Sequence, residues 1–393
     1  MLRSAAAADL VRLRAFAARA GASGVLEAHV GRPRYRPQLT RVAERDGELV
    51  GCALIAHRRL RLGAATLDVG VLEAIVPRPD SRLTEVSHAL LGEYLGTLYE
   101  QDLPLAALCG HADQYTPFGF APYLLRSRVT LPQVDAVVVD RTAGAPALTL
   151  AAEADLEDLA ALYEVSYASV PLSEARAKPD WRALLTAPGE LLALRDVRGR
   201  TAAYARLVPL LDNLVVTECG AADSSAARGL LAALGPRGVG ELWLAPGHIV
   251  AQAGLHLGGE LRLSAPPAEA PLALAGVVDL PGVLSALVPE LERRLATSRY
   301  AGWGGEVRLE LEQSRATLLL ECGRATVVDG TRPAAVRLRR VTLSAVAQLL
   351  LGYRGASDLR ATGGLDCDDT ALSLVDVLFP FLGACGDGNV LYT

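Results

Sequence analysis

Apolar residues change their spacing twice between residues 68 and 110. The run Asp68-Val-Gly-Val-Leu-Glu-Ala-Ile-Val76 is β-branched and almost continuously apolar, which is typical of a strand covered on both faces. Pro77 and Pro79 exclude a helix at the next positions, because proline lacks an amide donor. Leu105–Cys109 predicts a second strand. Between the two strands, a helical period is carried by Leu83, Val86, Leu90, Leu91, Tyr94, Leu95 and Leu98. The pattern predicts a strand–loop–helix–strand unit.

A weak internal repeat suggests two related regions. Ala8–Leu13 opens an amphipathic helix and returns in similar form at Ala154–Leu159. In the first region, Arg41–Glu44 and Leu49–Ile55 predict a hairpin around Asp46-Gly47, and 126–131 is expected to close its sheet.

A proline-rich segment, Ser264–Pro271, is the clearest linker. A helix at Pro281–Leu295 and alternating strands are predicted beyond it. We therefore expect a mixed α/β (α+β) chain of three domains, at 1–133, 148–265 and 272–393.

Composition excludes several classes of protein. The 393 residues are 51% hydrophobic, but no apolar run approaches the roughly 18 residues needed to cross a bilayer, so we expect no stable membrane insertion. The start of the chain does not resemble a signal peptide, which favours a cytoplasmic location. The net charge of −5 comes without a basic stripe, so nucleic-acid binding is not expected. The six scattered cysteines predict small buried thiols and no metal site.

The turn after the second predicted strand carries a recognisable motif. Tyr115-Thr-Pro-Phe118-Gly119-Phe120-Ala-Pro, in its strand, Val-Pro, helix, strand setting, resembles the core of the GNAT-superfamily N-acetyltransferases. The whole chain is similar to the enhanced intracellular survival (Eis)-like branch of that superfamily. The resemblance implies an active GNAT domain, a degenerate second GNAT domain and a sterol-carrier-protein-like C-terminal domain. It also implies acetyl-CoA as co-substrate and a homo-oligomer, with a hexamer as one candidate.

The resemblance assigns roles to residues of the first domain. The backbone of Ala74, Ile75 and Val76 would hold the pantetheine arm and polarise the thioester. Tyr115 would protonate the departing thiolate, a role that suits a phenol because its ordinary pKa is near 10. The alternative is a loop tyrosine packed beneath the turn, while Phe118 and Phe120 are expected in the core.

Two carboxylates are candidates for the general base. Glu73 is a charge inside an apolar strand, where an unpaired carboxylate is costly. It is either a general base, acting directly or through water, whose pKa burial raises, or a carboxylate that is paired with an arginine or lies at a domain interface. In the Eis-like group the base is instead the C-terminal carboxylate. That role would fall to Thr393, although the family usually ends on an aromatic residue, and here Thr393 follows Tyr392.

The pyrophosphate of the cofactor is expected at the start of the predicted helix, where backbone amides are unpaired. The superfamily pattern there is Arg/Gln-x-x-Gly-x-Gly/Ala, and of it only Arg82 remains. Glu85 would bring a negative charge to a dianion. The candidate contacts are Ser81, Arg82, Thr84, Glu85, Val86 and Ser87.

Two functions remain open from the sequence. One is an N-acetyltransferase that acetylates a cationic acceptor, either a small-molecule amine or a lysine-bearing peptide. The other is a degenerate GNAT relative that binds a lipid-like ligand or a protein without catalysis. The intact Tyr115 turn favours the first function, and the altered helix start favours the second.

Overall fold

The computed structural model describes residues 1–79, 83–132, 148–210, 213–264, 271–312, 314–329 and 333–385. The chain forms two compact units, one with the described residues of Met1–Tyr123 and Ala268–Leu382, the other with those of Leu124–Pro267 and Gly383–Thr393. Both units combine helices with β-sheets, so the predicted mixed α/β class is confirmed. The division into three domains stays a prediction.

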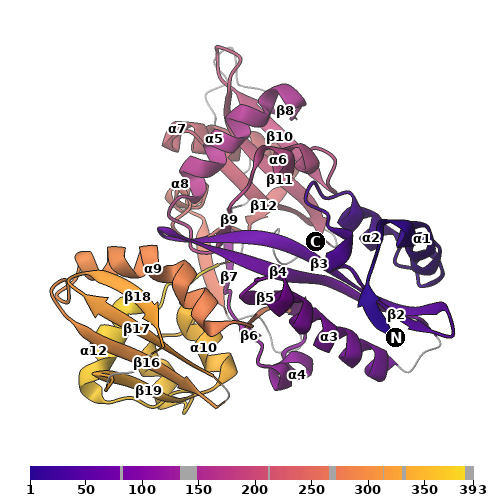
Figure 1. The fold of residues 1–393 in the computed structure, drawn as a ribbon. Coiled ribbons are helices and arrows are strands. Elements are labelled where there is room, and N and C mark those ends of the chain that lie inside the picture. Colours follow the sequence, from indigo (N-terminus) through magenta and orange to yellow (C-terminus); the bar gives the residue numbers. More distant parts are fainter. Residues whose placement is uncertain are drawn as a thin grey trace. The chain divides into compact units, whose positions relative to one another are not determined.

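The first unit contains a sheet in the order β1-β2-β3-β4-β5-β15-β6, in which β4 and β5 are parallel and the other neighbouring strands antiparallel. Figure 1 labels β2 to β6 of this sheet. Its strands are β1 (Leu2–Ser4), β2 (Arg41–Arg45), β3 (Glu48–Leu62), β4 (Ala65–Pro77), β5 (Leu105–Gly110), β6 (Ala121–Pro122) and β15 (Leu272–Val277). Three longer helices accompany it: α1 (Leu10–Arg19), α2 (Ser23–Val30) and α3 (Leu83–Glu100).

Helices cover both faces of this sheet. Leu72 of β4 packs in one apolar cluster with Tyr94 of α3, whereas Val76 of β4 packs in another with Phe16 of α1. Side chains of one strand that reach opposite clusters are expected where both faces are buried. The strand–helix–strand prediction is confirmed, with β4, α3 and β5 close to the predicted ranges.

Two strands have partners that the sequence pattern did not predict. β15 lies between β5 and β6, although the sequence analysis placed residues from 272 onward in the C-terminal domain. β7 (Arg126–Thr130) pairs with β13 and β14 of the other unit's sheet and does not close the first sheet. The expectation for 126–131 was therefore wrong, because an alternating pattern specifies which face of a strand is buried but not its neighbour.

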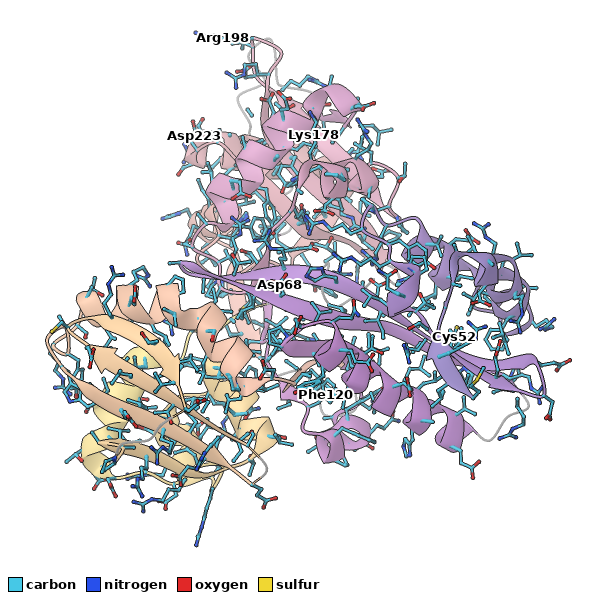
Figure 2. The ribbon with its side chains drawn as sticks, viewed as in Figure 1. Cys52, Asp68, Phe120, Lys178, Arg198 and Asp223 are labelled. Atoms are coloured by element: carbon cyan, nitrogen blue, oxygen red, sulfur yellow. The ribbon has the colours of Figure 1, made fainter. Side chains whose placement is uncertain are left out.

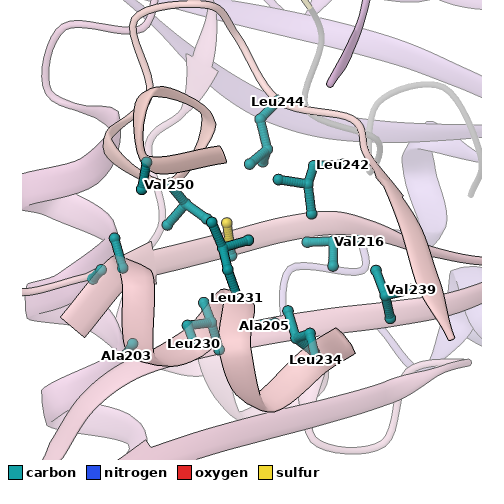
Figure 3. Packing of buried hydrophobic residues seen from close by; sticks show 14 of the residues in the cluster. Ala203, Ala205, Val216, Leu230, Leu231, Leu234, Val239, Leu242, Leu244 and Val250 are labelled. Atoms are coloured by element: carbon teal, nitrogen blue, oxygen red, sulfur yellow. The ribbon is translucent and has the colours of Figure 1, made fainter. Parts of the chain in front are cut away.

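The second unit contains a seven-stranded sheet in the order β14-β7-β13-β12-β11-β10-β8. Its core joins Leu230 and Leu234 of α7 to Val216 and Leu242 on the strands (Figure 3). Its elements besides β7 are β8 (Leu148–Leu150), α5 (Leu156–Tyr167), β9 (Ser173–Glu174), α6 (Lys178–Leu184), β10 (Glu190–Arg195), β11 (Thr201–Leu210), β12 (Asn213–Ala221), α7 (Ser224–Leu234), β13 (Val239–Leu242), α8 (Ile249–His256) and β14 (Glu260–Ser264).

The C-terminal part of the first unit is built on a four-stranded sheet in the order β18-β17-β16-β19. Its helices and strands are α9 (Leu280–Ala296), β16 (Gly305–Leu311), β17 (Arg315–Glu321), β18 (Arg324–Val328), β19 (Val336–Val341), α10 (Leu343–Leu350), α11 (Ala356–Ala361) and α12 (Asp369–Leu378). Its likeness to a sterol-carrier protein stays a prediction.

Two expectations from composition can be compared with the described residues. Among these, we find no helix with the length and apolar character needed to cross a membrane. Four of the six cysteines are buried as predicted, but Cys109 and Cys322 are exposed.

Candidate active site

The strands β4 and β5 part at the centre of the first sheet. They pair in parallel from Val69 opposite Leu105 to Leu72 opposite Leu108. In the described residues, β4 then continues to Pro77 paired with β3, while Cys109 and Gly110 of β5 pair with β15. We call residues 73–77 and 109–110 the β4–β5 fork. Within the fork, the described backbone groups of β4 that face β5 have no partner on β5, and those of β5 that face β4 have none on β4.

A β-bulge bends β4 at the base of the fork. Leu54 lies opposite Ala74 and Ile55 opposite Leu72, so Glu73 is the extra residue of the bulged strand. A bulge of this kind bends the strand and increases its twist. It also accounts for the observation that Glu73 and Ala74 both contact the α1–α2 side, since Glu73 bonds His29 of α2 and Ala74 packs on the cluster around Phe16.

The hydrogen-bond alternation of β4 determines which backbone groups face the fork. The Arg78 N–H donates to the Val50 carbonyl at 2.9 Å, which makes Arg78 and Val50 a bonded antiparallel pair. Bonded and non-bonded pairs alternate, so the N–H and C=O of Ile75 point away from β3 and toward the fork. Pro77, two residues later, also lies at a position that does not bond β3, so its missing N–H costs no hydrogen bond with that strand.

Tyr115 lies at the C-terminal end of α4 (Ala112–Tyr115), just after β5. A Cβ added to Gly110 would stand 2.4 Å from Cε2 of Tyr115, so the ring occupies space that only glycine leaves at the end of β5. Burial raises the pKa of Tyr115, which therefore keeps its proton at neutral pH. The ring meets Phe120 edge-on, with centroids 6.1 Å apart.

The turn that carries Tyr115 is held from both ends. β15 pairs with β5 before the turn and with β6 after it. Ser344 and Gln348 of α10 donate to the carbonyls of Phe120 and Pro122, at 3.4 and 3.3 Å. Gly119 has φ of 86°, a left-handed conformation that glycine adopts without strain. Figure 2 labels Phe120 at this turn.

Glu73 lies in a buried cluster of charged groups. Its Oε2 is 2.7 Å from Nδ1 of His29, and its Oε1 is 2.6 Å from Nη2 of Arg32 and 3.1 Å from Nη2 of Arg58. The side chains of His29, Arg58 and Glu73 are 2%, 6% and 5% exposed. Burial alone would raise the pKa of Glu73, but the His29 hydrogen bond and the two guanidinium charges outweigh it and lower the pKa to about 2. These contacts favour the arginine-paired alternative, and a carboxylate with so low a pKa is a weak base.

The candidate phosphate contacts are only partly described. Ser81 and Arg82 lie outside the described residues, and of Thr84 the structure describes the helical backbone but not the side chain. Glu85 is exposed on the first turn of α3, and Val86 packs so closely on Gly51 that a Cβ there would lie 2.7 Å from it. Ser87 is half-buried on the same turn. Gly51 pairs with Pro77, so α3 begins near the end of β4.

One predicted site residue lies outside the described residues, and three residues around Glu73 were not predicted from the sequence. Thr393 falls outside the described residues, so its role stays a prediction. His29, Arg32 and Arg58 were missed because they reach Glu73 from α2, from the loop after it and from β3. The run His57-Arg-Arg-Leu-Arg61 was a usable signal, since charges that interrupt an apolar strand require partners.

Part of the chain matches a known protein family. Residues 5–123 match the family model described as an acetyltransferase (GNAT) domain, a range that includes β4, α3, β5 and the Tyr115 turn. No curated protein matches the chain by sequence.

Solved structures share the fold over almost the entire chain. A GCN5-related N-acetyltransferase from Anabaena variabilis is 15% identical with a TM-score of 0.71, and covers 96% of this chain and 97% of its own. A GCN5-related N-acetyltransferase from Kribbella flavida is 17% identical with a TM-score of 0.69, with coverage of 98% and 96%. Eis1 from Mycobacterium abscessus is 19% identical with a TM-score of 0.63, with 99% of both chains covered. Residues 5–123 therefore carry a GNAT acetyltransferase domain, within a chain whose fold resembles that of these three structures.

Proposed function

We propose that the chain is an N-acetyltransferase that transfers the acetyl group of acetyl-CoA to the amine of an acceptor. The observation that carries the proposal is the β4–β5 fork. On its β4 side the N–H and C=O of Ile75 point into the fork, and on its β5 side Tyr115 packs on Gly110. An open backbone edge, a protonated hydroxyl and a nearby helix start suit a thioester carried on a long amide-bearing arm.

The fork suits the pantetheine arm of CoA. An extended amide chain adds to an open strand edge through main-chain hydrogen bonds, as peptides do in β-augmentation. Ile75 offers one donor and one acceptor for this purpose, flanked by Ala74 and Val76. The first amides of α3, from Leu83 to Val86, have no partner within the helix and suit the pyrophosphate. Ser81, Arg82, Thr84 and Ser87 are proposed to add side-chain contacts, and exposure lets the Glu85 carboxylate remain in solvent.

The transfer itself requires two proton movements. The neutral amine nitrogen attacks the thioester carbon, a C–N bond forms and the C–S bond breaks. Tyr115 donates its hydroxyl proton to the leaving sulfur, and its raised pKa ensures that the proton is present at neutral pH. We propose that a backbone N–H at the fork stabilises the developing oxyanion.

The acceptor amine must also lose a proton. A small-molecule amine or lysine side chain is cationic at neutral pH, so a base must act before or during attack. Two candidates remain, the Thr393 carboxylate that the family resemblance suggests and Glu73. The contacts of Glu73 with His29, Arg32 and Arg58 make it the weaker candidate, and we propose that it orders the α2 side of the fork.

Release of free thiol from acetyl-CoA in the presence of amines tests this function. The purified chain is assayed against a panel of small-molecule amines and a lysine-bearing peptide, with Tyr115→Phe and the exposed Tyr99→Phe as matched variants. We expect amine-dependent turnover that Tyr115→Phe lowers roughly 100-fold or more and Tyr99→Phe leaves unchanged. Binding of acetyl-CoA without turnover on any amine would favour the non-catalytic alternative.

A further inference from the structure

The hydroxyl of Tyr94 lies between the two strands at the last rungs before the fork. It donates to the Gly70 carbonyl of β4 at 2.7 Å and accepts from the Ala107 N–H of β5 at 3.0 Å. The Ala107 carbonyl oxygen is 3.1 Å away. The side chain comes from the middle of α3 and is completely buried. A side-chain oxygen therefore contacts the backbones of both strands at once.

This position is normally occupied by direct strand–strand hydrogen bonds. In a parallel pair with Val71 opposite Ala107, the Ala107 N–H would donate to Gly70 and the Ala107 carbonyl would accept from Leu72. The Tyr94 oxygen stands within hydrogen-bond distance of the Gly70 carbonyl and of both backbone groups of Ala107, and hydrogen bonding from the Ala107 and Leu72 backbone opposes the rise in the Tyr94 pKa that burial causes. An oxygen inserted at such a rung holds the two backbones farther apart than a direct bond would.

The packing of α3 explains how the hydroxyl reaches the rung. Leu98, one helical turn after Tyr94, fills the space of the absent Gly70 side chain, where a Cβ would lie 2.1 Å from Cδ2 of Leu98. The helix therefore approaches β4 closely enough for the phenol to enter the ladder. The Tyr94 ring stacks on Phe120 with centroids 6.4 Å apart, and Phe120 contacts the ring of Tyr115.

We propose that the Tyr94 hydroxyl is a wedge that separates β4 from β5, keeps the β4–β5 fork open for the pantetheine arm and so sets the affinity for acyl-CoA. The parallel pairing ends one residue beyond this rung, at Leu72 and Leu108, which is where the fork begins. Tyr94 is a positioning residue, because it contacts the strands and not the reacting atoms. The effect on acyl-CoA affinity rests on the proposed function, whereas the separation of the two strands by Tyr94 is a property of the ligand-free chain.

Amide-resolved hydrogen exchange on the ligand-free Tyr94→Phe chain tests the wedge without any cofactor. The variant keeps the ring and its stacking on Phe120 and loses only the inserted oxygen. We expect the strands to close and form the direct rung, so the amides of Leu72 and Ala107 exchange more slowly than in the wild type. Faster or unchanged exchange would overturn the wedge, because the hydroxyl would then only satisfy backbone groups that stay apart. Tyr99→Phe, on the same helix with its side chain 70% exposed, is the control.

Calorimetric binding to the same variants tests the consequence for the cofactor. We expect Tyr94→Phe to weaken acetyl-CoA roughly tenfold, while 3′-phospho-ADP, which lacks the pantetheine arm, binds as in the wild type. Equal weakening of both ligands, or of neither, would overturn the role in the pantetheine site. If the wild type binds no acetyl-CoA, the proposed function and this consequence both fail, and the exchange result still decides whether Tyr94 separates the strands.

Discussion

Replacing Glu73 with Gln removes the carboxylate that joins His29, Arg32 and Arg58, and the structure allows the effect on stability to be worked out. The pKa of Glu73 falls from its ordinary 4.5 to about 2 on folding, which corresponds to roughly 3 kcal/mol of stabilisation by the charged form. Breaking a buried ion pair from one side costs a similar amount, about 3–5 kcal/mol, because the partner charges stay buried. We expect Glu73→Gln to lower the free energy of unfolding at pH 7 by about 3 kcal/mol.

The effect of pH follows from the direction of the shift. A carboxyl group whose pKa is lower in the folded state stabilises the fold fully above its unfolded pKa of about 4.5, and this stabilisation is lost as the pH falls toward 2. The difference in the free energy of unfolding between wild type and variant should therefore be less than half as large at pH 3 as at pH 7. Urea unfolding followed by circular dichroism measures it, because Trp181 and Trp243 lie in the second unit and only Trp303 in the first, so tryptophan fluorescence would mix the unfolding of the two units.

Glu85→Gln is the matched control, since Glu85 is exposed on α3 and its loss should change stability by no more than about 0.5 kcal/mol. A Glu73→Gln chain as stable as the wild type at pH 7 would refute the reasoning. A chain that keeps its stability and loses turnover would instead identify Glu73 as the proton acceptor.

Three further substitutions, one of them with a matched control on α3, test the fork and its turn. Ile75→Pro removes the N–H that faces the fork, at a position in phase with Pro77, and should weaken acetyl-CoA roughly tenfold by calorimetry; unchanged affinity would exclude that amide as a contact. Gly119→Ala places a Cβ 2.8 Å from Leu343 at φ 86° and should lower the melting temperature, whereas Gly96→Ala, on α3 with open space around it, should raise stability by about 0.5–1 kcal/mol. Gln348→Leu removes the donor to the Pro122 carbonyl and should lower kcat more than it raises KM for acetyl-CoA, with the reverse pattern arguing against a role in holding Tyr115.

Local periodicity was sufficient to predict β4, α3 and β5, because the spacing of apolar residues within each of these elements shows which face is buried. The predicted hairpin was too short, ending at Ile55, where the charged run begins, whereas β3 continues to Leu62 and turns at Gly63 with φ of 59°. Arg58 is tolerated inside the strand because Glu73 of β4 pairs with it. A charge in a strand is compatible with burial when its partner comes from the neighbouring strand, which sequence spacing does not reveal.

The site was predicted in part for a similar reason. Glu73 and Tyr115 stood out as a charge in an apolar run and as part of a motif. Tyr94 looked like one more residue of an apolar helical face, and only the register of β4 and β5 reveals where its hydroxyl lies. The strand β15 and the helix α10, which hold the Tyr115 turn, come from residues more than 140 positions later in the chain. Such non-local contacts depend on the tertiary fold.

Calorimetric titration of the purified chain with acetyl-CoA tests the central claim most directly, with free CoA and 3′-phospho-ADP as comparison ligands. The account predicts saturable binding at one site per chain, with a dissociation constant in the micromolar range or tighter, that Ile75→Pro weakens. No saturable binding up to millimolar acetyl-CoA would contradict the assignment of the β4–β5 fork to the cofactor.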